Sequence, residues 1–293
     1  MRNASYQPEM TAPDYDLARL QIVTPRHYGR WLAAAAILLV LAVLVKAFAD
    51  GQIAWRVVGQ FFTAPAIMAG LVNTIIMTVC AMALGILLGV VFAVMAMAPN
   101  PVLKGVAALY IWFFRGTPLI LQLLLWFNLA LVFPRLGIPD LFSVRTVEVI
   151  TPFVATLLGL GINQGAYTAE VVRSGILSVD SGQTEAAQAI GMTRLATLRR
   201  IVMPQAMRVI IPPVGNEVIS MVKLTSVASV IQYSEILRNA QTIYYANSFV
   251  IELLFVAAIW YLAVVTVLSV GQHFLERHFA KGHRRPAAGK VAP

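Results

Sequence analysis

The sequence predicts an all-α integral membrane protein with about six transmembrane helices and one long cytoplasmic loop. Of its 293 residues, 59% are hydrophobic and 12% are charged, and the mean hydropathy is +0.77. Soluble domains carry about 25% charged residues. The charges gather in gaps between apolar runs long enough to cross a bilayer. We therefore interpret the net charge of +9 as a signal of membrane topology and expect no nucleic-acid partner.

The N-terminal region begins with a polar segment. Residues 1–30 contain prolines and show no helical period, which predicts a cytoplasmic tail. Residues 31–49 form the first apolar run, broken only by Lys46, whose side chain can reach the membrane edge. The run ends in a small-x-small string that also has the form of a signal-peptide cleavage site, so the retention of residues 1–49 stays open.

The remaining apolar runs predict five further spans. No charge occurs between Arg56 and Lys104, and that stretch is too long for one span of about 20 residues. We divide it into an outer interfacial segment at 50–66 and a span at 67–96. Later spans are expected at 103–132, 149–170, 207–231 and 251–273. Outer loops are expected around Pro134, Pro139 and Asp140 and through Ser234 and Asn247. These five spans form a core at 67–273, and a basic cytoplasmic tail follows at 274–293.

Lys and Arg fall mostly on one side of these spans. The outer segments carry only Arg56, Arg135, Arg145 and Arg238, whereas most of the other cations lie on the opposite side. The positive-inside rule then places both termini and the loop at 180–205 in the cytoplasm. Because the chain has no internal repeat, a two-fold symmetric pathway would need a second subunit.

The loop at 180–205 is longer than a connection between two spans requires. Asp180 can cap a helix, and Gly191 can end that helix in the left-handed conformation. Thr193 can cap a second helix that ends before Pro204. We expect two short helices joined by a bend.

The first of these helices carries small side chains. Ala186, Ala187 and Ile190 form a compact apolar face, which lets a foreign surface approach the backbone. Glu185 lies in the first turn, where the helix dipole favours an acid. Arg194 lies near the start of the second helix, where the dipole disfavours a cation, and we expect it to pair with an acid of a partner.

The spacing of this loop resembles the EAA loop of ABC importer permeases. Glu185-Ala186-Ala187 is followed by Gly191 after three residues and, after nine more, by the string IVMP ending at Pro204. The family pattern usually has Leu where this chain has Met203. The resemblance implies docking into a groove of a separate ATPase subunit by Glu185, Ala186, Ala187, Gly191, Arg194, Ile201 and Pro204.

Other strings are similar to permeases of the polar amino-acid uptake branch, the histidine, glutamine and arginine type. They are NTI at 73–75, FFRGTP at 113–118, AYTAE at 166–170 and KLTS at 223–226. The resemblance covers about residues 67–273, a five-helix core in that family, so the span at 31–49 is an additional N-terminal helix. It implies a multi-pass permease subunit of the bacterial inner membrane that imports a polar amino acid and is not itself an enzyme.

The resemblance also implies partners. The sequence has no G-x-x-x-x-G-K-[ST] string, so we expect this chain to bind no cofactor, with ATP and Mg on a partner ATPase. A second permease subunit, identical or different, and an extracytoplasmic solute-binding protein would complete the importer in the lipid bilayer. An opine, cystine or an osmolyte would fit the same scaffold, so the substrate stays open.

A zwitterionic substrate needs polar partners along its path. Its carboxylate requires a cation or a helix N-terminus, and its ammonium requires an acceptor. A helix break at Gly116 would leave Arg115 and Thr117 beside a new helix start near Pro118. Alternatively, Arg115 anchors a helix at the membrane interface or pairs inside the bundle.

Polar residues also mark the span at 149–170. Asn163, Tyr167 and Glu170 share one helical face, with Gln164 beside them, and this stripe is a candidate lining of the pathway. Glu170 is equally placed to form an ordinary ion pair with Arg173.

The span at 207–231 contains charges. Lys223 shares a face with Asn216 and Ser220 and is a further pathway candidate, and Glu217 is a candidate because intramembrane charges are usually functional. The consecutive prolines at 212 and 213 are expected to interrupt this helix.

Small residues recur every fourth position in the span at 67–96. The stripe consists of Ala81, Gly85, Gly89 and Ala93. Such stripes permit close helix crossing, so we expect packing within the bundle or against a second permease.

Other functional classes lack their signals. All four histidines lie in the tails or at a span end, Cys80 is the only cysteine, and no H-E-x-x-H string occurs, so we expect no catalytic or metal-binding residue. A channel or ion-coupled carrier is the remaining alternative and would work without any ATPase.

Overall fold

The computed structural model describes residues 28–138 and 142–280. The predicted tails up to residue 27 and beyond residue 280, together with Pro139 and Asp140 of the predicted outer loop, lie outside these residues. The chain divides into two compact units, residues 1–53 and 54–293. The first contains α1 (Tyr28–Ala49), which covers the predicted run at 31–49 and is apolar except for Arg30 near its start and Lys46 in its last turn. Its 22 residues give it a length of about 33 Å, enough for one span.

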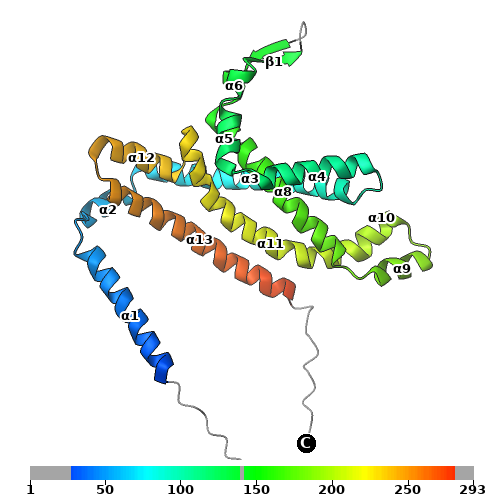
Figure 1. The fold of residues 1–293 in the computed structure, drawn as a ribbon, viewed down its shortest axis with the longest axis horizontal. Coiled ribbons are helices and arrows are strands. Elements are labelled where there is room, and N and C mark those ends of the chain that lie inside the picture. Colours follow the sequence, from blue (N-terminus) through cyan, green and yellow to red (C-terminus); the bar gives the residue numbers. More distant parts are fainter. Residues whose placement is uncertain (1–27, 139–141, 281–293) are drawn as a thin grey trace, which may run out of the picture. The chain divides into compact units, whose positions relative to one another are not determined.

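The second unit contains the other elements (Figure 1). In chain order they are α2 (Trp55–Phe62), α3 (Pro65–Met97), α4 (Pro101–Gly116), α5 (Leu119–Phe127), α6 (Leu129–Val132), β1 (Arg135–Ile138), β2 (Phe142–Arg145), α7 (Thr146–Val149), α8 (Pro152–Leu177), α9 (Ser181–Ala189), α10 (Arg194–Thr197), the π-helical turn η2 (Leu198–Val202), α11 (Met203–Leu224), the 3-10 segment η3 (Thr225–Ile231), α12 (Ile236–Asn247) and α13 (Val250–Ala280).

The described residues contain four helices long and apolar enough to cross a membrane, or five if the bent pair α4 and α5 counts as one span. We assign α8 (Pro152–Leu177) to the remaining predicted span, the one at 149–170. It has 26 residues but is less apolar than the other spans. It packs against α3, α4, α5 and α11 (Figure 1), and many of its residues are buried inside the bundle. A helix inside the bundle can carry Asn, Gln and Thr where a lipid-facing helix cannot.

The most extensive helix pair is α3 with α8. A Cβ at Gly85 would lie 2.6 Å from the Gln164 side chain, and one at Gly89 would lie 2.6 Å from Thr168. Both glycines are buried, as are Ala81 and Ala93 of the same stripe. The predicted stripe is thus a packing surface within this chain, where missing side chains let two helix backbones approach closely.

The predicted span at 103–132 is broken. α4 ends at Gly116 and α5 begins at Leu119, with a bend of 102° between them. Pro118 has no N–H group, so the Phe114 carbonyl loses its helical donor. Instead, Asn163 Nδ2 donates to this carbonyl at 2.7 Å and Gln122 Nε2 donates to it at 3.0 Å. The break expected at Gly116 is therefore present and is held by two side-chain amides.

The prediction that consecutive prolines interrupt the span at 207–231 is wrong. Pro212 and Pro213 both lie inside the continuous helix α11. The carbonyls that lose a helical donor to these prolines are those of Arg208 and Val209. Beside them, Gln272 Nε2 of α13 donates to the Pro212 carbonyl at 2.8 Å and Asn216 Nδ2 donates to it at 3.3 Å, so α13 packs closely against this turn.

Both predicted outer loops contain more structure than expected. The segment after α6 forms an antiparallel hairpin, with Arg135 paired to Arg145 and Leu136 to Val144. The segment through Ser234 and Asn247 contains α12, which packs on α3 and α13. Glu235 caps α12 by accepting hydrogen bonds from two backbone N–H groups. Neither element shows the long apolar run by which the spans were recognised.

Candidate functional site

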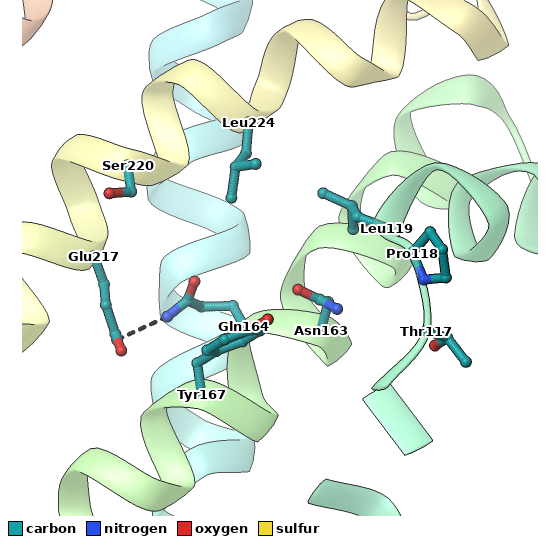
Figure 2. Close-up of a pocket in the computed structure, with 9 residues that line it drawn as sticks. All are labelled: Thr117, Pro118, Leu119, Asn163, Gln164, Tyr167, Glu217, Ser220 and Leu224. Atoms are coloured by element: carbon teal, nitrogen blue, oxygen red, sulfur yellow. Dashed lines mark hydrogen bonds between the residues drawn. The ribbon is translucent and has the colours of Figure 1, made fainter. Parts of the chain in front are cut away.

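A cavity of about 440 Å³ lies between the α4–α5 break, α8 and α11 (Figure 2). Its walls are contributed by three parts of the chain that are far apart in sequence. The lining residues are Thr117, Pro118, Leu119, Asn163, Gln164, Tyr167, Glu217, Ser220 and Leu224. Four of the predicted pathway residues, Thr117, Asn163, Gln164 and Tyr167, are thus brought to one place.

One side of this cavity is the helix break. Thr117 and Pro118 stand there, opposite Glu217, at the start of α5 (Figure 2). No side chain caps α5, so the positive end of its dipole faces this wall. Thr117 Oγ1 is already engaged, because it donates to the Phe113 carbonyl and accepts from Gln122 Nε2 at 2.8 Å. The polar groups of the break mainly hold its own backbone in place.

The opposite side carries the carboxylate of Glu217. Gln164 Nε2 donates to its Oε2 at 2.7 Å, and Thr168 Oγ1 donates to the same oxygen at 2.9 Å. No Lys or Arg lines the cavity, and Glu217 forms no ion pair within the described residues. The cavity therefore has an acidic wall and a weakly positive wall, and it can orient a ligand that carries charges of both signs.

Glu217 is the main residue of the cavity that the sequence pattern did not place there. Its charge inside a span was the available signal. Its partners, however, lie 49 and 53 residues earlier in the chain, on α8. The sequence does not show how α8 and α11 are rotated relative to each other, and this rotation decides the pairing.

Arg115 lies beside the cavity. Its Cζ atom sits 5.2 Å from the centroid of the Tyr167 ring, a cation–π distance, and its side chain is exposed. Arg115 does not line the cavity itself. The Arg115 guanidinium therefore lies at the edge of the cavity, where its contact within the chain is with the Tyr167 ring.

Two predicted pathway residues lie elsewhere. Glu170 Oε2 accepts from Arg173 Nη2 at 2.8 Å, the ordinary helix-end ion pair that the sequence also allowed. Lys223 is exposed and does not line the cavity. Neither residue therefore lines the cavity with Asn163 and Tyr167, and their place in a transport pathway stays a prediction.

The loop at 180–205 begins as expected. Asp180 Oδ1 accepts from the Gly182 N–H at 2.7 Å and caps α9. Gly191 is left-handed with φ +81°. The Gly191 N–H donates to the Gln188 carbonyl at 2.9 Å, and the Met192 N–H donates to Ala187 at 3.0 Å. These two bonds form a Schellman motif, which satisfies the last carbonyls of α9.

The second half of the loop differs from the prediction. Thr193 caps α10 as expected, since its Oγ1 accepts from the Ala196 N–H at 3.3 Å. The helix does not end before Pro204 but continues from Arg194 to Ile231. Pro204 is the second residue of α11 and follows the π-helical turn η2, so the irregular hydrogen bonding expected at a missing N–H group falls at this point of the continuous helix. The loop is thus one short helix followed by the start of a span.

The side chains of the loop are unevenly exposed. Ala187 is buried at 2% exposure, so only Ala186 of the two predicted contact alanines is open. Ile190 and Leu195 are apolar yet 78% and 74% exposed. Glu185 and Arg194 line a shallow hollow of about 530 Å³ but form no ion pair with each other in the described part of the chain. These exposed apolar and charged groups make the loop a candidate interaction surface.

Comparisons with known proteins agree with this architecture. Residues 85–281 match the family model described as binding-protein-dependent transport system inner membrane component. The chain is 43% identical over 266 residues to the arginine transport system permease protein ArgU of Corynebacterium glutamicum, covering 89% of this chain and 83% of the relative. It is 37% identical to the L-cystine transport system permease protein TcyB of Bacillus subtilis, covering 77% of this chain and 91% of the relative.

A solved structure gives the same result. The chain is similar, with a TM-score of 0.65 and 36% identity, to a chain of a crystal structure of an amino acid ABC transporter with histidines, covering 73% of this chain and 94% of that one. The model match spans more than half of the chain, and the relatives are aligned across both the cavity and the loop. The chain therefore belongs to the family of inner membrane components of binding-protein-dependent transport systems.

Proposed function

We propose that this chain is the permease subunit of an ATP-driven importer for a cationic amino acid. The observation that carries the substrate class is the cavity of Figure 2, where Glu217 is the only charged lining residue among those that the structure describes. A ligand that brings a net positive charge gains a partner there, whereas an acidic amino acid would be repelled. The name of ArgU, an arginine transport permease, supports the same class.

The two ends of such a ligand fit the two walls. The side-chain cation would lie against Glu217, replacing part of the hydrogen bonding from Gln164. The α-carboxylate would face the start of α5 or the guanidinium of Arg115. Asn163 and Thr117 would hold the break in shape rather than bind, because their donors are used on the backbone of α4.

Energy would enter through the loop at 180–205. Glu185, Ala186, Ile190 and Arg194 present an exposed surface for a separate ATPase that carries ATP and Mg. Because α10, η2 and α11 form one continuous helix up to Ser220 and Leu224 of the cavity, a push at the loop would move the cavity wall. A second permease and an extracytoplasmic binding protein complete this proposal, with both termini in the cytoplasm.

The proposal is tested by uptake of labelled arginine into cells that express the chain with its ATPase and binding protein. We expect uptake that stops when ATP is depleted. Glu217→Gln keeps the shape of the side chain but removes its charge, and it should lower arginine uptake at least about tenfold, the value of one charged hydrogen bond.

Glu148→Gln is the matched control, because Glu148 is an exposed carboxylate near the hairpin. It should leave uptake unchanged. Arginine uptake that survives Glu217→Gln would contradict the cationic substrate, and cystine uptake by the unaltered chain would favour the chemistry named for TcyB. Uptake that continues without ATP would contradict the importer itself.

A further inference from the structure

We propose that the groove between α3, α4 and α8 at the Lys104 end is a binding site for a monoanionic phospholipid. This groove has a volume of about 430 Å³ and is separate from the cavity of Figure 2. Its lining consists of Ala96, Lys104, Ala108, Ile111, Trp112, Glu170 and Arg173. None of the transport steps proposed above uses it.

The charges of the groove add up to one positive charge. Lys104 and Arg173 contribute two cations, and Glu170 contributes one anion. Arg173 and Glu170 neutralise each other through a 2.8 Å ion pair. Lys104 forms no ion pair in the described part of the chain, so its ammonium is available. One free cation beside a neutral pair matches the single charge of a phosphodiester.

The cation of the groove and its apolar lining follow one another along α4, as the headgroup and the acyl chain do in a lipid. Lys104 is in the first turn of α4, where the positive end of the helix dipole also favours an anion. Trp112 lies eight residues further on, about 12 Å along the axis, and is 71% exposed. Ala108 and Ile111 lie between them. A headgroup at Lys104 would thus place its acyl chain along the apolar floor beside Trp112.

The alternative occupants fit less well. A zwitterionic phospholipid would bring its own ammonium next to Lys104, which would repel it. A free phosphate would leave the apolar floor and Trp112 exposed. Basic pockets between spans on the cytoplasmic side commonly hold anionic headgroups. The assignment to the inner leaflet rests on the orientation proposed above, whereas binding itself does not.

The test is native mass spectrometry of the importer complex, purified in mild detergent and mixed with phosphatidylglycerol or phosphatidylethanolamine of identical acyl chains. We expect phosphatidylglycerol to be retained preferentially. Lys104→Gln should weaken its retention about fivefold, the effect of one Lys at an anionic headgroup. Ala108→Phe should weaken retention too, because it fills the apolar floor without changing any charge.

Arg208→Gln is the control for general attraction by cations on the same predicted side, since Arg208 is exposed and outside the groove. It should retain the lipid like the unaltered chain. Equal retention of both lipids, or full retention by both Lys104→Gln and Ala108→Phe, would overturn the site. Because neither outcome depends on uptake, a failed transport assay and a failed lipid site are told apart.

Discussion

The α3–α8 seam, where Gly85 and Gly89 of α3 meet α8, differs from the loop at 180–205 in how its side chains are partnered. In the seam, Gly85 and Gly89 press against Gln164 and Thr168, and the polar side chains find partners inside the same chain. In the loop, Ile190 and Leu195 are exposed, and neither Glu185 nor Arg194 has an ion-pair partner among the described residues. The loop satisfies its own backbone through caps and the Schellman motif but leaves its side chains open.

The two regions should respond differently to substitution. A region whose polar groups are paired internally loses stability when it is altered. A region whose backbone is satisfied but whose side chains are open loses an interaction with a partner instead. Changes in the interior should therefore appear in unfolding experiments, and changes in the loop should appear only in coupling experiments.

The strongest predicted effect concerns Glu235, whose side chain is buried and whose backbone packs on Gly70 of α3. Burial raises the pKa of Glu235 from its ordinary 4.5 to about 7, although Tyr261 and two backbone N–H groups donate to it. Between these values the folded protein keeps a proton on Glu235 that the unfolded chain releases, so the contribution of Glu235 to stability is greatest below pH 4.5 and is lost as the pH rises through 7. The loss should be on the order of 3 kcal/mol, at about 1.4 kcal/mol for each pH unit.

Thermal unfolding in detergent at a series of pH values measures this dependence. Glu235→Gln has nearly the same shape and cannot titrate, so its stability should change much less across the window. A variant whose pH dependence equals that of the unaltered chain would show that other groups control the titration.

The second effect tests the seam. Gly89→Ala should destabilise the protein by about 2 kcal/mol, because the new methyl group would lie 2.6 Å from the Thr168 side chain and the two helices would have to separate. Gly105→Ala is the matched control, since a Cβ at Gly105 meets nothing within 4 Å. The comparison is made by melting temperature in the same detergent. Equal melting temperatures would mean that the seam is less tightly packed than these distances indicate.

The smallest free-energy effect tests the loop. Glu185→Lys should lower ATP-driven uptake about tenfold, or about 1.4 kcal/mol, by placing a like charge beside Arg194 on the surface proposed for the ATPase. The melting temperature of the isolated chain should stay unchanged, because Glu185 is exposed and makes no hydrogen bond that stabilises α9. Glu148→Lys serves as the control. If Glu185→Lys lowered the melting temperature but left uptake normal, the loop would contribute to stability rather than to coupling, and the expected difference between interior and loop would be wrong.

Much of the fold follows from local properties of the sequence. The apolar runs predicted the spans, because crossing a bilayer requires about 20 apolar residues whatever the neighbouring helices are. Asp180, Gly191 and Thr193 marked the helix ends correctly, because capping is a matter of a few consecutive residues. The string around Pro118 likewise indicated the break between α4 and α5.

The wrong expectations concern regions where tertiary contacts override local preference. Pro212 and Pro213 stay helical in a turn of α11 against which α13 packs. Pro204 lies within a continuous helix rather than at the end of one. α12 was missed because it has no long apolar run, and the packing of its short apolar face (Ile236, Ala240, Ile243 and Tyr244) together with its contacts with α3 and α13 stabilises it.

The membrane class, the apolar spans and the helix ends of the loop at 180–205 follow from the sequence alone, because they depend on hydrophobic length and on short capping patterns. Only the tertiary structure decided which polar groups meet. The pairing of Glu217 with Gln164 and the hydrogen bond from Asn163 to the α4 carbonyl depend on how the helices are rotated against one another. Rotation is set by packing of small residues along the α3–α8 seam and its neighbours, which joins positions that are distant in the chain.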